Sequence, residues 1–300
     1  MTTNGQTAFD AARAADLMRR ACERVGLVPD KLELLRLGDH AVFRFDEGRV
    51  VSRVGRHPGR LPSVRREVAV ARWLEAVEYP AARLVTEAEQ PIVVEGHPVT
   101  FWEALADGDT YASTQEMGEL LVRLHELKPP SFPLPGLRPF EKVRQRLEHA
   151  EIRNETRRYL SGLTEELVEE FRNVESVLPR GHLHGDFNVG NVLRDAAGNA
   201  RVIDVDGFTT GPREWDLVQT AMYYDSFGWH TAAEYADFTI GYGFDVRQWS
   251  GYRVFRSVRE LLMISWLSQN AGVDARVAEE VDKRVETLRF GTSRRIWAPF

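Results

Sequence analysis

The chain has 300 residues, of which 43% are hydrophobic and 28% charged, and its formal net charge is −6 at pH 7. These values are typical of a globular protein with one large domain or two lobes, and they argue against a general nucleic-acid-binding protein. The single cysteine, Cys22, excludes an intramolecular disulfide framework, and no stretch is apolar enough to cross a bilayer. We therefore expect a cytoplasmic protein that binds neither nucleic acid nor membrane.

The first third of the sequence alternates helical and strand patterns. Apolar residues recur at helical spacing over 8–25, and Gly26 ends that helix. A second amphipathic helix is predicted over 63–77, with Ser63 as a candidate N-cap. Strands are predicted within 32–45, joined at Gly38-Asp39-His40, and over 49–54, 82–87 and 92–101.

The rest of the sequence is mainly helical in pattern. A helix over 114–127 is followed by a proline-rich extended stretch and then by charged helices within 140–178. Four more helices are predicted towards the end of the chain, with Trp266 in the core: 215–224, 229–242, 246–269 and 274–288.

Between these helical regions lies a short polar segment with a kinase-like order of side chains. His184-Gly185-Asp186 is followed by Asn191, then by a hairpin, and then by Ile203-Asp204-Val205-Asp206-Gly207. We expect Asp186, Asn191 and Asp204 to converge at one end of a small sheet. Phosphoryl transfer needs a group that orients the acceptor hydroxyl and oxygen ligands for a divalent metal, and this spacing supplies both.

These motifs, followed by Glu214-Trp215-Asp216-Leu217, resemble the aminoglycoside phosphotransferase family, which includes choline-type kinases and is similar to protein kinases in fold. The resemblance runs from about Leu32 to Leu217. It implies an α+β, protein-kinase-like two-lobe fold, with an N-terminal antiparallel sheet plus helix and a mainly helical C-terminal lobe. It further implies a nucleotide-binding lobe over 1–100, a hinge over 101–106 and a catalytic and acceptor-binding lobe over 107–300.

The resemblance also assigns the catalytic and metal-binding roles. Asp186 would orient the acceptor hydroxyl and take its proton late, while Asn191 and Asp204 would hold Mg²⁺. Asp206 is a rival ligand, because Asp206-Gly207-Phe208 also looks like a metal-binding motif. We prefer Asp204, which ends the apolar strand, although residues two apart on a continuing strand could both face the metal.

The nucleotide site is expected in the first lobe. Arg53 would bind phosphate oxygens, because the guanidinium group can donate two hydrogen bonds to them at once. Glu67 would pair with Arg53. Arg44 and Arg49 are neighbouring alternatives, and the ordinary interpretation of Arg53 is an exposed strand arginine. The resemblance alone makes Gly38 a residue that covers the phosphates. It likewise assigns the adenine contacts to the extended backbone at Phe101, Glu103 and Leu105.

The acceptor site is less sharply indicated. Asn188 could contact metal, substrate or its own backbone, and Asp225 lies in an aromatic patch that suits a cationic or sugar-like acceptor. Ordinary core and surface packing would explain that patch equally well. His184 is expected to brace the loop, and Asp216 to anchor the loop or cap a helix.

The predicted activity is ATP- or GTP- and Mg²⁺-dependent transfer of a γ-phosphoryl group to a hydroxyl of a small molecule, by a monomer or homodimer. An aminoglycoside or another antibiotic is among the candidate acceptors, and the role would then be antibiotic resistance. The alternatives are a catalytically weak nucleotide-binding regulatory protein on the same fold, a kinase acting on protein side chains, and a metallohydrolase using His182-x-His184-x-Asp186. The presence of Asp186, Asn191 and Asp204 together favours the small-molecule kinase.

Overall fold

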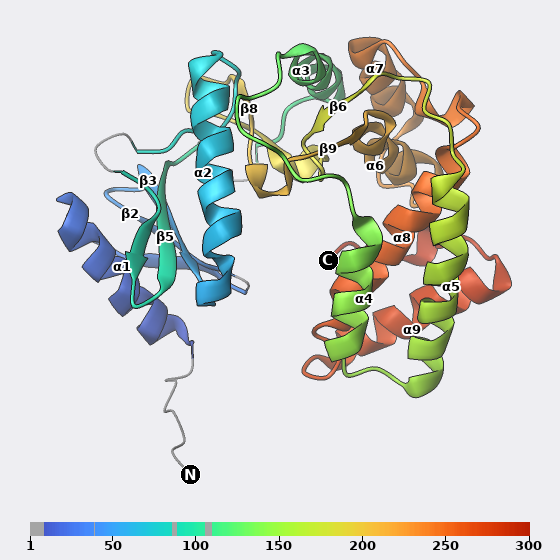
Figure 1. The fold of residues 1–300 in the computed structure, drawn as a ribbon, viewed down its shortest axis with the longest axis horizontal. Coiled ribbons are helices and arrows are strands. Elements are labelled where there is room, and N and C mark those ends of the chain that lie inside the picture. The colour runs from blue at the N-terminus through green and yellow to red at the C-terminus, as the bar shows by residue number, and fades with distance from the viewer. Residues whose placement is uncertain (1–8, 39, 86–88, 106–109) are drawn as a thin grey trace. The chain divides into compact units, whose positions relative to one another are not determined.

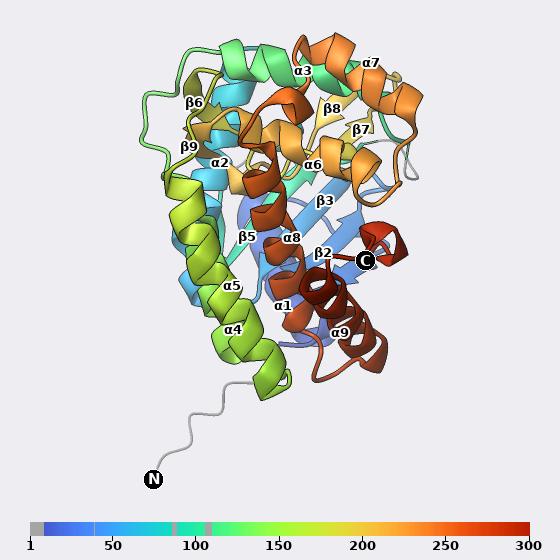
Figure 2. The ribbon, with the colours of Figure 1, turned by 90° about the vertical axis from the view of Figure 1, so that its right-hand side faces the viewer.

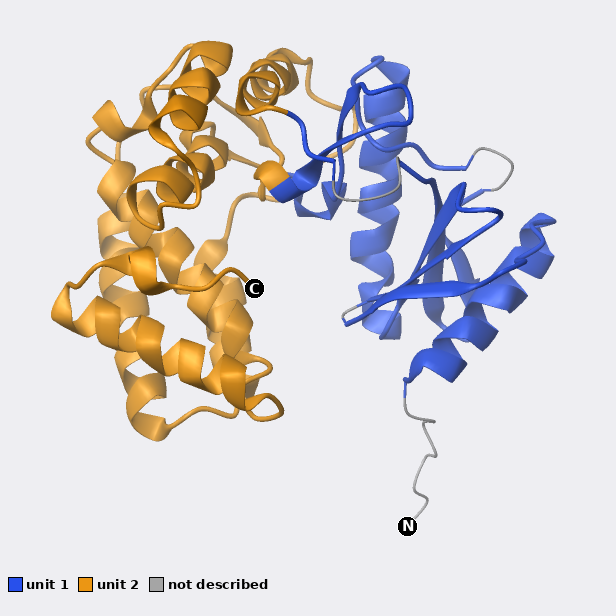
Figure 3. Ribbon diagram, turned by 180° about the vertical axis from the view of Figure 1, so that it is seen from behind, with its two compact units in different colours: residues 1–112, 190–208 blue, residues 113–189, 209–300 orange. Residues whose placement is uncertain are grey.

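The computed structural model describes residues 9–38, 40–85, 89–105 and 110–300. Asp39 of the predicted first turn and the end of the predicted strand over 82–87 lie outside these ranges. The described chain is an α+β structure in which an antiparallel sheet precedes a run of helices, as the resemblance implied (Figure 1). It divides into two compact units, one formed by Met1–Ala112 and Gly190–Phe208, the other by Ser113–Val189 and Thr209–Phe300 (Figure 3).

The first unit is built on a five-stranded antiparallel sheet with strand order β1-β2-β3-β5-β4. Its strands are β1 (Glu33–Leu37), β2 (His40–Phe45), β3 (Val50–Gly55), β4 (Ile92–Val94) and β5 (His97–Glu103). Two helices, α1 (Ala11–Val25) and α2 (Leu61–Ala76), lie on opposite sides of the sheet (Figure 1).

The two faces of this sheet have different chemistry because successive strand residues point to opposite sides. On β3 and β5, Val54, Val99 and Phe101 are buried in the apolar core that α1 completes. Arg53 alternates with these residues and meets Glu67 of α2. The strand alternation therefore places the charged Arg53 on the α2 side of the sheet.

The strand pairing near β4 differs from the prediction. No strand forms over the described residues of 82–87, and the predicted strand over 92–101 is instead a hairpin of β4 and β5. Glu95 and Gly96 form its turn with positive φ values of 49° and 84°. A two-residue turn of this kind matches the twist of the strands it joins, and this local geometry outweighs the continuous apolar pattern.

The start of α2 is also different from the predicted one. The helix begins at Leu61, two residues before Ser63, and the Ser63 hydroxyl donates to the Arg60 carbonyl at 2.8 Å instead of capping the helix. Pro62 explains the earlier start, because proline fits the first turn of a helix, where its missing N–H has no intrahelical partner.

A small hairpin completes the first unit. It consists of β7 (Val192–Arg194) and β8 (Ala200–Val202). The Ala82 amide donates to the Val202 carbonyl, and the Ala112 amide donates to the Val192 carbonyl. These bonds fix the hairpin in the first unit, although it follows the second unit's first helices in the sequence.

The second unit is mainly helical. Its helices are α3 (Thr114–Glu126), α4 (Pro139–His149), α5 (Asn154–Arg172), α6 (Glu214–Asp225), α7 (Ala232–Tyr242), α8 (Tyr252–Ser268) and α9 (Ala275–Phe290). Helix α8 lies beside α4, α5 and α9 (Figure 2). The second unit also contains a two-stranded antiparallel sheet of β6 (Arg180–Leu183) and β9 (Thr209–Pro212).

Helices α3 and α7 pack at close range through two glycines. A Cβ on Gly118 would lie 2.5 Å from the Phe238 carbonyl oxygen, and one on Gly241 would lie 2.3 Å from the Gln115 carbonyl oxygen. These positions therefore require glycine for steric reasons. The close approach lets His125 of α3 accept or donate a hydrogen bond at 2.9 Å with the Tyr242 hydroxyl of α7.

The end of the chain is held by Trp297, which is 2% exposed and stacks on Phe227. Its indole N–H donates to the Thr287 hydroxyl at 2.8 Å. The prediction that Trp266 is a core residue is wrong, since this side chain is 36% exposed. Core residues of α8 recur three or four positions apart, and Trp266 falls between Ile264 and Leu267, out of that phase.

Candidate active site

The loop after β6 is anchored by the buried carboxylate of Asp216 on α6. This carboxylate accepts hydrogen bonds from the backbone N–H groups of His184 and Gly185 at 2.8 and 2.9 Å, and His125 binds it at 3.1 Å. Burial alone would raise the pKa of Asp216, but the His125 hydrogen bond and nearby positive charge outweigh it and lower that pKa. The prediction that Asp216 anchors the loop is confirmed.

Asp186 presents its carboxylate from this anchored loop. Its side chain is 54% exposed, whereas its neighbour Phe187 is buried. Its backbone N–H donates to His184 Nδ1 at 3.3 Å, so His184 braces the loop as predicted. The loop thus combines a fixed backbone with a carboxylate that a second molecule can reach.

Arg259 of α8 is the basic residue beside Asp186, with 3.5 Å between Nη1 and Oδ1. The guanidinium is buried, lies 4.1 Å from the centre of the Trp215 ring and donates to the Trp215 carbonyl at 3.1 Å. Sequence reasoning missed Arg259. The available signal was a charged residue on the apolar face of α8, next to Val258 and Leu261, which only the helix phase reveals.

The two histidines of the loop are engaged in structural hydrogen bonds. His182 Nε2 lies 2.6 Å from the Leu124 carbonyl, to which its N–H donates, and burial lowers the pKa of His182. Among the described residues, no group of three or more His, Cys, Asp or Glu side chains is placed to hold a metal ion. The hydrogen bonds of His182 to the Leu124 carbonyl and of His184 to the Asp186 N–H give both histidines a structural role.

Asn188 turns back on its own loop, since its side-chain amide donates to the Asp186 carbonyl at 3.1 Å. Of the three roles considered for Asn188, this is the backbone contact. The bond adds a constraint on the backbone that carries Asp186.

The candidate metal ligands lie in the first unit, at the open end of the β7–β8 hairpin. The Ile203 amide donates to the Asn191 carbonyl at 2.9 Å, just beyond the last strand pair, Val192 with Val202. Asn191 and Asp204 therefore leave the hairpin at the same end. Asp186 belongs to the second unit, so the convergence of all three side chains stays a prediction.

Asp204 adopts the left-handed backbone conformation, with φ 59° and ψ 53°, and begins the 3₁₀ turn Val205–Gly207. Aspartate is among the few residues other than glycine that enter this region readily. Asp206 follows in the turn, with Arg60 at 4.0 Å from its carboxylate. Both carboxylates are partly exposed.

Arg53 connects these carboxylates to α2. Its Nη1 donates to Glu67 Oε1 at 2.9 Å and to Asp204 Oδ1 at 3.1 Å, which confirms the predicted contact between Arg53 and Glu67. Arg49, one of the alternatives, is an exposed residue paired with Asp46. The arrangement favours Arg53 over Arg49 as the functional arginine of the sheet.

The electrostatics of this cluster follow from burial beside several carboxylates. Burial raises the pKa of Glu67 to about 7, with Arg53 opposing and the charges of Asp206 and Asp204 adding to the rise. Burial would lower the pKa of Arg53, but Glu67, Asp204 and Asp206 outweigh it, so that pKa is raised. Arg53 therefore stays charged and the cluster keeps an excess of acidic groups.

The remaining predicted nucleotide residues occupy the sheet. Gly38 follows β1, and a Cβ there would meet nothing closer than 3.8 Å, so the structure does not require glycine at this position. Phe101 is buried in the core; its N–H donates to Gln90 and its carbonyl accepts from Val85. The Phe101 backbone is thus hydrogen-bonded within the first unit, and its contact with an adenine ring stays a prediction.

The predicted hinge continues beyond Phe101. Glu103 ends β5 with an exposed side chain, and its N–H donates to the Arg83 carbonyl at 2.9 Å. Leu105 is half-buried and is the last described residue before 110. Glu103 is thus the last residue of β5, and Leu105 lies two residues beyond it.

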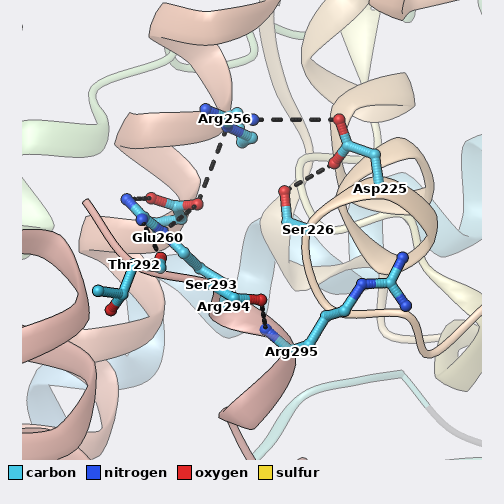
Figure 4. Close-up of a pocket in the computed structure, with 8 residues that line it drawn as sticks. All are labelled: Asp225, Ser226, Arg256, Glu260, Thr292, Ser293, Arg294 and Arg295. Carbon is cyan, nitrogen blue, oxygen red and sulfur yellow. Dashed lines mark hydrogen bonds and ion pairs between the residues drawn. The ribbon is translucent and has the colours of Figure 1, made fainter.

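The predicted acceptor residue Asp225 ends α6 in the second unit. Its carboxylate accepts from the Ser226 hydroxyl at 2.6 Å and lies 4.0 Å from Arg256 (Figure 4). The neighbouring rings of Tyr223 and Phe227 pack on Trp229; Phe227 is buried, whereas Tyr223 and Trp229 are partly exposed.

The oxygen donors of the β7–β8 hairpin fit a divalent cation. Mg²⁺ prefers carboxylate and amide oxygens, and Asn191, Asp204 and Asp206 offer these within one short segment.

A bilayer-spanning helix is not found among the described residues, because none of their helices is both long and apolar enough.

Comparisons with known proteins show which family the sequence matches. A model of the phosphotransferase enzyme family (APH) matches residues 34–255. A comparison with curated protein sequences found no match.

Solved structures share the fold of this chain. The amicoumacin kinase hAmiN, in complex with AMP-PNP, Ca²⁺ and Ami, is 15% identical with a TM-score of 0.67, over 90% of this chain and 91% of that one. The aminoglycoside phosphotransferase APH(3'')-Id from Streptomyces rimosus is 17% identical with a TM-score of 0.62, over 84% and 98% of the two chains. A choline/ethanolamine kinase family protein from Mesorhizobium loti is 17% identical with a TM-score of 0.57, over 91% and 94%.

These solved relatives establish a kinase-like fold, and the family model extends over most of the sequence. The chain therefore belongs to the phosphotransferase enzyme family and is a phosphotransferase.

Proposed function

We propose that this phosphotransferase moves the γ-phosphoryl group of ATP or GTP to a hydroxyl of a small molecule. The observation that supports this most directly is the exposed carboxylate of Asp186 on a loop whose backbone is held by buried Asp216. A fixed carboxylate is what an acceptor hydroxyl needs to be oriented in line with a phosphoryl group.

Asp186 receives the hydroxyl hydrogen bond and takes the proton as the new phosphorus–oxygen bond forms. Carboxylates are weak bases at neutral pH, so the main contribution is orientation and late acceptance of the proton. Arg259 holds the Asp186 side chain from the buried side and is a positioning residue.

The nucleotide is assigned to the first lobe, 1–100, and to the hinge over 101–106. Arg53 binds phosphate oxygens and Glu67 orients its guanidinium. In this proposal Gly38 covers the phosphates, and the backbone near Glu103 and Leu105 contacts the base. Phe101 shapes the core behind that segment.

Asn191, Asp204 and Asp206 are the residues that would hold Mg²⁺. When bound, the metal neutralises charge on the phosphate oxygens. Arg53 also contacts Asp204, so the same carboxylate connects the metal-binding hairpin to the phosphate-binding arginine. The AMP-PNP and Ca²⁺ named with hAmiN support a nucleotide and a divalent cation as cofactors.

The acceptor is assigned to the second lobe, 107–300, where Asp225 and Asn188 lie with Asp186. The solved relatives include an amicoumacin kinase, an aminoglycoside phosphotransferase and a choline/ethanolamine kinase family protein. Aminoglycosides, other antibiotics and amino-alcohols are therefore the first acceptors to examine.

The proposal is tested by measuring ATP and GTP consumption with Mg²⁺ across a panel of hydroxylated small molecules. Wild type is compared with Asp186→Ala and with Asp237→Asn, which removes an exposed carboxylate of α7. Acceptor-dependent turnover that disappears only in Asp186→Ala supports the proposal. Nucleotide binding without turnover on any acceptor would support the regulatory alternative, and equal turnover in all three proteins would exclude Asp186 as the base.

A further inference from the structure

The last residue of α7 is linked to the loop of Asp186 by a chain of buried hydrogen bonds. The Tyr242 hydroxyl lies 2.9 Å from Nδ1 of His125, and Nε2 of the same ring lies 3.1 Å from Oδ2 of Asp216. All three side chains are buried, so water has little access to these bonds. The chain lies within the second unit, to which Asp186 also belongs.

Asp216 Oδ2 is the atom at which this chain meets the loop. The same oxygen accepts the backbone N–H of His184 at 2.8 Å, and the other carboxylate oxygen accepts that of Gly185 at 2.9 Å. His125 therefore binds the atom that holds the backbone just before Asp186. If the His125 ring turned away, Oδ2 would lose a donor, and a buried carboxylate that loses a donor is destabilised.

The partners of the His125 ring determine which of its nitrogens carries a hydrogen. Despite its burial, Asp216 has a pKa that the His125 hydrogen bond lowers, so its carboxylate is ionised and can only accept. Nε2 of His125 therefore carries a hydrogen and donates it to Asp216. In the neutral imidazole Nδ1 is then an acceptor, and the Tyr242 hydroxyl donates to it. With a partner at each nitrogen, the direction of the ring is fixed.

Tyr242 is itself held at a defined position against α3. A Cβ on Gly118 of α3 or on Gly241 of α7 would lie within 2.5 Å of a backbone oxygen of the other helix, so the two helices are in direct backbone contact. Tyr242 follows Gly241, and α7 ends directly after it in the left-handed C-cap Gly243. The close packing of α3 and α7 therefore sets the distance from the Tyr242 hydroxyl to His125.

A second contact holds the same loop independently of Tyr242. The Trp215 indole N–H donates to the Gly185 carbonyl at 3.0 Å. Removal of the Tyr242 hydroxyl should therefore loosen the loop without releasing it. The expected size of the effect is that of one net hydrogen bond, a factor of about three to ten in an equilibrium.

We propose that Tyr242 is a positioning residue for Asp186 and that it acts through His125 and Asp216. The inference rests on the proposed function, since it takes Asp186 as the group that receives the acceptor hydroxyl. It extends the support of Asp186 from α6 to α7, a helix that carries none of the residues assigned to nucleotide, metal or acceptor.

The test is amide hydrogen exchange of the full chain, followed by NMR without nucleotide or acceptor. In Tyr242→Phe, the amides of His184 and Gly185 should exchange about three to ten times faster than in wild type, the effect of losing one net hydrogen bond. The control Tyr235→Phe removes another hydroxyl of α7, one that donates to Asp245 at 2.6 Å, and should leave both amides unchanged. The amides of α8 report any global loss of stability in either variant.

A double-mutant cycle determines whether Tyr242 acts through His125. His125→Gln keeps an N–H group for Asp216 but removes the second ring nitrogen that Tyr242 binds. In the His125→Gln background, Tyr242→Phe should therefore add little to the exchange of His184 and Gly185, because both changes break the same chain. Thermal unfolding confirms that each variant is folded.

Kinetics then connect the loop to the reaction. With an acceptor from the panel, Tyr242→Phe should lower kcat by about three- to tenfold and leave the nucleotide KM unchanged, whereas Tyr235→Phe should change neither. A lower kcat without faster exchange of His184 and Gly185 would contradict the proposed route from Tyr242 to Asp186.

The inference is overturned if Tyr242→Phe exchanges like wild type, if Tyr235→Phe has the same effect, or if the two changes of the cycle are additive. Faster exchange with an unchanged kcat would remove the positioning role. Absence of turnover in wild type would contradict the proposed function, while the exchange measurement would still decide whether Tyr242 holds the loop.

Discussion

Arg259 holds its guanidinium 3.5 Å from the Asp186 carboxylate while remaining buried against Trp215. Burial lowers the pKa of Arg259, and the carboxylates of Asp186 and Asp216 oppose that effect. The buried arginine is thus matched to the one exposed carboxylate of the anchored loop, which suggests that it fixes the direction in which Asp186 points.

Replacing Arg259 with Met should lower kcat by about tenfold, equivalent to about 1.4 kcal/mol of transition-state stabilisation, and leave the nucleotide KM nearly unchanged. Arg259→Lys should recover only part of kcat, because an ammonium cannot keep both the Trp215 carbonyl and the Asp186 contact. Steady-state kinetics measure this, with Arg253→Met at an exposed residue of α8 as the matched control. An unchanged kcat in Arg259→Met would remove the positioning role.

Glu67 should make stability depend on pH. Its ordinary pKa of 4.5 is raised to about 7 by burial, so ionisation is harder in the folded protein than in the unfolded chain. The contribution of Glu67 to the free energy of unfolding is therefore complete below about pH 4.5 and is lost as the pH rises to about 7.

Urea denaturation of wild type and Glu67→Gln across this range measures the effect. The stability of wild type relative to Glu67→Gln should fall as the pH increases from 4.5 to 7. The exposed Glu148→Gln should show no such trend. A constant difference between wild type and Glu67→Gln would contradict the assigned environment.

Asp204 should control the response to metal. Asp204→Asn keeps a residue that tolerates the left-handed backbone at φ 59° but weakens oxygen ligation. The Mg²⁺ concentration for half-maximal turnover should rise by about tenfold or more, equivalent to about 1.4 kcal/mol or more. Turnover is titrated with Mg²⁺ for Asp204→Asn, Asp206→Asn and the control Asp237→Asn. A larger effect at Asp206 would make it the main ligand, and normal titrations in both variants would exclude this hairpin.

Two tryptophans test which part of the C-terminal region carries stability. Trp297→Ala should cost about 3–5 kcal/mol, because it empties a buried site against Phe227. Trp266→Ala should cost less than about 1 kcal/mol, since this side chain is partly exposed on α8. Chemical denaturation of both variants compares them, and equal losses would contradict the anchoring role of Trp297.

Two site contacts follow from the motifs and from no local pattern. Asp216 anchors the His184–Gly185 backbone, as its place in the motif predicts, and Arg53 meets Glu67, as the resemblance to the family predicts. The order of helices in the second unit follows instead from a short-range pattern, apolar residues three and four apart.

Other features depend on contacts that no local pattern contains. The Glu95-Gly96 turn breaks a continuous apolar run, and the pairing of Phe101 with Gln90 is visible only once both strands are placed. Arg259 is buried where α8 meets α6. The helix phase of α8 marks Arg259 as a charged residue on its apolar face, but it does not show that Asp186 and Trp215 are its partners, because tertiary packing decides these contacts.

The central claim is that Asp186 receives the acceptor hydroxyl in phosphoryl transfer, and one measurement tests it most directly. The nucleotide dissociation constant and kcat are measured for wild type and Asp186→Asn with an acceptor from the panel. The account predicts an unchanged dissociation constant and a fall in kcat of about 10²–10⁴-fold, the range for loss of a positioned proton acceptor. If kcat of Asp186→Asn stays within about twofold of the wild-type value, the fall is far smaller than that range, and this result would contradict the assigned role of Asp186.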